Sequence, residues 1–213
     1  MIAWRFLGDT AICLDVGGDA PLEANAIVHE LGRRLRDARV PGVRDVVPAM
    51  TTLTLHVDPL RTDLGTIESL VADTPDEIRV ACATGQEHEV PVRYGADAGP
   101  DLETVARATG LTAADVVRRH LASTYQVCFL GFMPGFAYLG LVPETLRVPR
   151  RETPRTLVPA GSVAIADVFT AVYPSDSPGG WHVIGRTDRP LFDLSRRQPS
   201  LFAPGDHVRF VEA

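Results

Sequence analysis

Hydrophobic and polar residues follow two different periods along the first 72 residues. A period of two, typical of strands, appears at 2–7, 10–16, 42–50 and 51–58. Helical spacing of apolar residues appears at 21–36 and 62–72. Gly8-Asp9 predicts a turn between the first two strands, and Asp19 with Pro21 predicts the start of the first helix. The order ββαββα predicts a small α+β domain in which two helices cover a sheet.

The periodicity lapses around residues 75–86, where we expect a boundary between a domain over 1–80 and a second over 81–213. The second part begins with a predicted strand over 89–94, followed by helices near 102–108 and 113–122. Thr112, with Asp115 three positions on, predicts a capping box for the second of these helices. From Tyr125 onward, short β-rich runs alternate with Pro/Gly turns. This pattern predicts a β-barrel or a closed sandwich.

The charge and composition exclude several classes of function. A net charge of −6 over 213 residues argues against a nucleic-acid partner, because phosphate contacts need a concentrated basic face. All 21 basic residues are Arg. A Walker A loop, a Schiff-base lysine and a serine–lysine hydrolase all need a lysine ammonium, so none of them is possible. A cationic side chain that holds an anion here must be an arginine.

The cysteines, the longest apolar run and the histidines bear on cellular location and metal binding. Cys13, Cys82 and Cys128 form no Cys-x-x-Cys pair, and no signal peptide is evident, so we expect a cytoplasmic protein. The apolar run 127–142 is broken by Pro134 and is shorter than the ~20 residues that span a bilayer, so no membrane partner is expected. The six histidines show no metal-ligand spacing, and we predict no metal site.

Three blocks in the C-terminal part carry a family resemblance. Residues 129–140 read FLGFMPGFAYLG, residues 149–162 read PRRETPRTLVPAGS, and residues 177–187 read SPGGWHVIGRT. Together, and in this order, they resemble the family of KipI and the 5-oxoprolinase B subunit, also called allophanate hydrolase subunit 1. The resemblance extends through GDTAICLDVG and VVPAMTTLTLHVDP in the N-terminal part, so it covers nearly the whole chain.

The resemblance implies a cyclophilin-like barrel after the N-terminal domain and a place in a hetero-oligomer. The implied partner is the 5-oxoprolinase C subunit, or allophanate hydrolase subunit 2, with the 5-oxoprolinase A subunit as a possible third component. That assembly is associated with ATP-dependent opening of 5-oxoproline to glutamate, and this chain itself carries no recognisable ATP loop. Related domains form part of urea carboxylase, and another relative inhibits a sporulation histidine kinase.

The candidate catalytic residues are His120, Arg155 and Arg186. His120 lies at the edge of a helical apolar face, where it is either a core histidine or a proton donor and carbonyl-polarising group. Arg155 and Arg186 are candidates because 5-oxoproline has a carboxylate that suits bidentate recognition by a guanidinium. The alternative for each arginine is a solvated surface position.

Five further residues are candidates for substrate binding: Ser162, Ser177, Gly179, Gly180 and Tyr138. Glycine-rich turns allow backbone N–H groups to approach a substrate oxygen, although turn and core roles are the ordinary alternatives for these residues. Asp167 and Phe169 stand where relatives usually have a glycine-rich segment, and a carboxylate near a carboxylate substrate is unfavourable.

The sequence therefore favours a component of an ATP-dependent 5-oxoprolinase, a cyclic amide hydrolase that is active only in complex. Two alternatives remain open. One is a component that acts on a ureido substrate in an allophanate hydrolase or urea carboxylase, and the other is a non-enzymatic histidine-kinase inhibitor of the KipI type.

Overall fold

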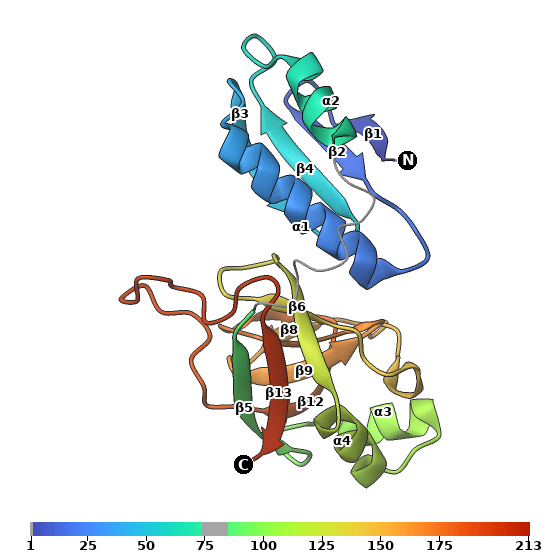
Figure 1. Ribbon diagram of the computed structural model, residues 1–213. Helices are drawn as coiled ribbons and strands as arrows, with labels where there is room; N and C mark the ends of the chain where they lie inside the picture. Colours follow the sequence, from blue (N-terminus) through green and yellow to red (C-terminus); the bar gives the residue numbers. More distant parts are fainter. Residues whose placement is uncertain (1, 74–84) are drawn as a thin grey trace. The chain divides into compact units, whose positions relative to one another are not determined.

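The computed structural model describes residues 2–73 and 85–213, and the chain divides into two compact units (Figure 1). The units are Met1–Thr84 and Gly85–Ala213. The boundary expected between residues 80 and 81 falls outside the described residues.

Within residues 2–73, the N-terminal unit is a four-stranded antiparallel sheet with two helices. Its elements are β1 (Ala3–Phe6), β2 (Ala11–Asp15), α1 (Pro21–Ala38), β3 (Val43–Pro48), β4 (Thr52–Val57) and α2 (Leu64–Ala72). The strands lie in the order β1-β2-β4-β3. Leu53 and Leu55 on β4 pack with Leu31 on α1 and Ile67 on α2, so one face of the sheet and both helices share a core. The helix α1 begins differently from the prediction, because its N-cap is Ala20, with no side-chain cap, rather than Asp19.

The C-terminal unit is built around a closed barrel. Its elements are β5 (Glu87–Tyr94), α3 (Leu102–Thr109), α4 (Ala113–Leu121), β6 (Thr124–Leu130), β7 (Ala137–Gly140), η2 (Glu144–Leu146), β8 (Arg155–Val158), β9 (Ser162–Ala166), β10 (Phe169–Val172), β11 (Ser177–Gly179), β12 (His182–Arg186) and β13 (His207–Glu212). Within residues 85–213, seven strands close in the order β10-β7-β6-β13-β5-β12-β9. β13 and β5 are parallel, and β8 pairs with β11 in a separate ribbon. The predicted barrel is confirmed.

The predicted capping box at the start of α4 is also confirmed. The Asp115 backbone N–H donates to Thr112 Oγ1 at 3.1 Å, and the Thr112 N–H donates to the Asp115 carboxylate at 3.4 Å. These two bonds satisfy N–H groups that a helix N-terminus otherwise leaves free. They fix where α4 begins, and so they fix the position of His120 near its end.

The barrel wall is buried on both faces along β9. Val163 and Ile165 point into the barrel core, whereas Ala164 and Ala166 belong to a second core cluster. Side chains of a strand alternate between the two faces of a sheet, so this second cluster covers the outside of the wall. The small alanines leave room there for large rings, including Tyr173 and Trp181.

Candidate functional site

Seven aromatic side chains form a layer on the outer face of the barrel wall. We call this set the aromatic layer: Phe129, Phe132, Phe136, Tyr138, Phe169, Tyr173 and Trp181. Phe136 meets Tyr173 edge to face at a centroid distance of 5.3 Å, and Trp181 at 5.7 Å. Tyr138 stacks on Phe129 at 4.2 Å. Residues of the first and third sequence blocks therefore meet in one layer, where such ring contacts are favourable.

A cluster of charged groups joins the second block to this layer. The Asp101 carboxylate accepts two hydrogen bonds from Arg155, at 2.6 and 2.8 Å, and one from Arg151 at 2.8 Å. Its fourth donor is the backbone N–H of Val183, at 2.8 Å. We call Asp101, Arg151 and Arg155 the arginine cluster. It ties the start of α3 to the loop before β8 and to β12.

Burial and charge oppose each other at Asp101. Burial raises the pKa of this carboxyl, but the hydrogen bond from Arg155, the Val183 N–H and the charges of Arg155 and Arg151 together lower it below its usual range. Asp101 is therefore ionised at neutral pH. The hydrogen bond with Asp101 also raises the pKa of Arg155. The cluster is a pair of cations that shares one anion.

The tyrosines of the layer are protonated donors beside further positive charge. Burial raises the pKa of Tyr138, and the nearby Arg150 opposes this shift only in part. Burial also raises the pKa of Tyr173. The backbone N–H of Trp181 and the charges of Arg150 and Arg155 lower it, but by less. Both hydroxyls keep their protons at neutral pH. Arg150 also lies 3.6 Å from Asp167, so the extra carboxylate noted in the sequence faces an arginine.

The β8–β11 ribbon brings the predicted glycine turn to the same place. Gly179 is the register partner of Arg155, and Ser177 is that of Val158. A Cβ on Gly179 would lie 2.5 Å from the Tyr173 hydroxyl oxygen, so the backbone packs directly against this ring. The Arg151 N–H donates to Gly180 O at 2.8 Å. Of the predicted residues, Arg155, Tyr138, Ser177, Gly179 and Gly180 lie in or beside the aromatic layer.

Ser162 and Arg186 lie together but in an adjoining position. They are register partners on β9 and β12. Ser162 is buried, and its carbonyl accepts the Tyr173 N–H at 2.9 Å. Arg186 is exposed and lines a hollow of about 250 Å³ that also includes Tyr173 and Gly161. Tyr173 therefore connects this hollow to the aromatic layer.

His120 lies elsewhere, in the barrel interior, with no exposed surface. Thr170 Oγ1 donates to Ala164 O at 3.1 Å, so it accepts from His120 Nε2 at 2.9 Å. His120 Nδ1 is then the acceptor for the Tyr94 hydroxyl at 2.8 Å. Burial lowers the pKa of His120 to about 3. A neutral, enclosed imidazole with both nitrogens occupied cannot protonate a substrate, so this geometry does not support the catalytic prediction for His120.

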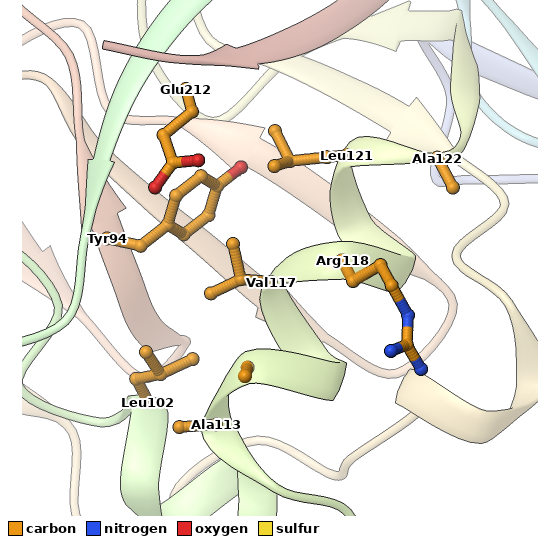
Figure 2. Close-up of a pocket in the computed structure, with 9 residues that line it drawn as sticks. Tyr94, Leu102, Ala113, Val117, Arg118, Leu121, Ala122 and Glu212 are labelled. Carbon is orange, nitrogen blue, oxygen red and sulfur yellow. The ribbon is translucent and has the colours of Figure 1, made fainter.

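A separate cavity of about 660 Å³ lies beside α4 (Figure 2). Tyr94 and Glu212 lie together on one wall, Val117 and Leu121 point from α4 toward the Tyr94 ring, and Arg118 points away from it. The walls are mostly apolar, and they include none of the predicted site residues. The three sequence blocks instead converge on the aromatic layer, which we take as the candidate site.

Sequence reasoning missed Asp101. It identified a helix from about residue 102 but gave its first turn no role, because nothing near Asp101 in the chain marks a partner. Among residues 2–73 and 85–213, no group of His, Cys, Asp and Glu is placed to hold a metal ion. Over the same residues, no helix combines the length and hydrophobicity of a membrane span.

Known proteins resemble this chain along nearly its whole length. It is 43% identical to the 5-oxoprolinase B subunit of Escherichia coli O157:H7, over 96% of this chain and 93% of that protein. It is 35% identical to the 5-oxoprolinase B subunit of Bacillus subtilis (strain 168), over 96% and 90%. These two relatives are therefore matched over nearly their full lengths.

Solved structures agree with this similarity. The structure of TTHA0988 matches 95% of this chain with a TM-score of 0.83 and 40% identity, and this chain spans only 39% of the TTHA0988 chain. The K. lactis urea amidolyase matches all of this chain with a TM-score of 0.82 at 16% identity, which shows a common fold over 15% of that larger protein. A family model, "Carboxyltransferase domain, subdomain C and D", matches residues 2–202, and the chain belongs to this family.

Proposed function

We propose that this chain is the B subunit of an ATP-dependent 5-oxoprolinase, which opens the lactam of 5-oxoproline to give glutamate. The observation that carries the proposal is the 43% identity, over 96% of the chain, to a protein named as a 5-oxoprolinase B subunit. The relative from Bacillus subtilis supports the same role. The chain is then one component of a cyclic amide hydrolase that acts in the cytoplasm, and it has no activity alone.

The candidate site suits a small carboxylate-bearing lactam. A lactam carbonyl is a poor electrophile, so ATP used by the complex supplies the activation, and this chain positions the substrate. Arg155 binds the substrate carboxylate, and Tyr138 offers a protonated hydroxyl within the aromatic layer. Backbone N–H groups around Ser177, Gly179 and Gly180 stabilise the developing oxyanion. Arg186 supports the same region from the adjoining hollow, and Ser162 is its register partner on β9.

The partner is the C subunit of the same enzyme, with the A subunit as a third component. Phe132 is 62% exposed and Leu157 is 57% exposed, and both belong to sequence blocks that meet at the aromatic layer. Large exposed apolar side chains beside a site favour a covering partner. ATP is assigned to the complex and not to this chain, which lacks a lysine for a Walker A loop.

The test is reconstitution of the complex. The chain is co-expressed with candidate C and A subunits, purified through a tag on one of them, and assayed for release of glutamate from 5-oxoproline with and without ATP. Activity is expected only with all three components and ATP. Urea and allophanate are assayed in parallel, because the family includes carboxyltransferase domains. Turnover of either of these in place of 5-oxoproline would replace the proposed substrate with a ureido compound.

A further inference from the structure

We infer that Asp101 is a positioning residue of the proposed site, which holds Arg151 and Arg155 together as a paired clamp for one carboxylate of the substrate. The inference rests on the proposed function and deepens it, since it assigns the group of 5-oxoproline that this part of the chain recognises.

The first support is that the Asp101 side chain does not cap its own helix. It is the N-cap residue of α3, where an aspartate ordinarily accepts an N–H of the first helical turn. No such side-chain cap is formed. Both carboxylate oxygens instead accept bonds from Arg151, Arg155 and the Val183 N–H. The side chain is aimed at residues far along the chain rather than at its own helix.

The second support is an imbalance of charge. Asp101 is the ion-pair partner of both Arg151 and Arg155, and among the described residues neither arginine forms another ion pair. The cluster therefore carries one surplus positive charge. The Nε atom of Arg151 is also buried and has no hydrogen-bond partner among the described residues. A second carboxylate would neutralise the cluster and suits the planar donor geometry of a guanidinium.

The third support is access. The Asp101 side chain is 4% exposed, whereas those of Arg151 and Arg155 are 28% and 26% exposed. The anion is thus enclosed behind two cations that are themselves partly open. Arg155 lies opposite Gly179 in the ribbon and near the Tyr173 hydroxyl, so the open side of the cluster borders the aromatic layer. Low polarity there strengthens an interaction between charges.

Asp101→Asn tests the inference, because asparagine keeps the size and acceptor oxygen but removes the charge that holds the two cations together. Isothermal titration calorimetry of the reconstituted complex gives the Kd of 5-oxoproline, and steady-state assays give kcat at saturating substrate. We expect the Kd to rise about tenfold or more, as for a lost charge-assisted pair, with kcat within about threefold of wild type. A purely structural role would lower Tm without this separation of Kd from kcat.

Glu30→Gln is the matched control, because Glu30 also accepts two hydrogen bonds from one arginine, Arg33, but in an exposed pair on α1 of the N-terminal unit. The Kd of 5-oxoproline should not change in this control variant. Arg151→Gln provides a second variant if Asp101→Asn does not fold, and the same rise in Kd is expected. If the wild-type complex binds and hydrolyses 5-oxoproline and both variants bind it with an unchanged Kd, the clamp is overturned and the proposed function stands. A wild-type complex that neither binds nor hydrolyses 5-oxoproline overturns both.

Discussion

Two buried polar centres of the barrel unit differ in how their charge is balanced and in how exposed their partners are. His120 bonds with Tyr94 and Thr170, and its imidazole is neutral and enclosed. Asp101 is similarly enclosed, but its two arginine partners share a single negative charge and remain partly exposed. A closed network stabilises a fold, whereas an open one with surplus charge can accept a ligand. From this difference we propose a structural role for the first centre and a binding role for the second.

The largest effect on stability is expected for Asp101→Ala. This change leaves two partly buried guanidinium groups and the Val183 N–H without their acceptor. The free energy of unfolding should fall by about 3 kcal/mol, as for other buried pairs that lose one partner. Urea denaturation of the wild-type chain and the variant measures it. The exposed ion pair of Asp188 with Arg93 supplies the control, and Asp188→Ala should have little effect on the free energy of unfolding. Equal effects at both aspartates would show that the arginine cluster is no more important than a surface pair.

A somewhat smaller effect should depend on pH through His120. Its pKa is about 3 in the folded chain, against about 6.5 when exposed, so below pH 6.5 the unfolded chain binds a proton that the folded chain does not. The contribution of the neutral form is therefore present above pH 6.5 and is lost as the pH falls toward 3. Between pH 7 and pH 5 this loss is about 2 kcal/mol.

His120→Gln removes the titrating group and keeps a side-chain donor for Thr170. Urea denaturation at pH 7, 6 and 5 should give a flatter dependence for this variant than for wild type. His56→Gln, at an exposed position of β4, is the control and should retain the wild-type slope. A slope that is the same in wild type and His120→Gln would mean that the imidazole is solvated and not enclosed.

A still smaller effect on stability should distinguish alanine substitutions at the two neighbouring glycines, Gly179 and Gly180. Gly179→Ala places a methyl group 2.5 Å from the Tyr173 hydroxyl oxygen and should lower the free energy of unfolding by about 1 kcal/mol. At Gly180 the nearest atom to a new Cβ is 3.6 Å away, so Gly180→Ala should leave Tm close to wild type. Thermal denaturation of both variants decides this. Equal Tm values for the two would argue against tight packing of the ribbon on the aromatic layer.

The smallest effect is expected at the cavity beside α4. Arg118 points away from Tyr94 in this cavity and pairs with Asp115 of its own helix (Figure 2). Arg118→Ala should leave kcat/KM for 5-oxoproline within about twofold of wild type in the reconstituted complex, since surface pairs contribute little. A large fall in kcat/KM would move the candidate site from the aromatic layer to this cavity.

Local signals in the sequence predicted the elements well, and distant partners limited the rest. The Thr112–Asp115 capping box lies within four residues and was readable, as was the succession of short strands that form the barrel. The prediction of Asp19 as the N-cap of α1 was wrong by one position. Pro21 is the first residue of the helix, so the residue before it, Ala20, is the N-cap. Such one-residue errors change little in the fold.

The site could be predicted only as three blocks and not as an arrangement. Asp101 bonds with groups 50, 54 and 82 positions away, and no local pattern encodes such separations. Spacing placed His120 at the edge of an apolar face. Its complete burial depends on Tyr94, 26 positions before it, and on Thr170, 50 positions after it. The sequence could therefore name candidate side chains such as His120 and Arg155. Which of them remain exposed to a substrate depends on how the barrel closes around them.

The most direct measurement is the rate of ATP-dependent glutamate release from 5-oxoproline by the reconstituted complex, compared among wild type, Arg155→Ala and His120→Gln at neutral pH. We expect Arg155→Ala to lower kcat/KM more than tenfold, in keeping with the loss of a charge-assisted contact to the substrate carboxylate, and His120→Gln to stay within about threefold of wild type. The reverse order, or a wild-type complex that releases no glutamate, would contradict the proposed role of this chain and the location of its site.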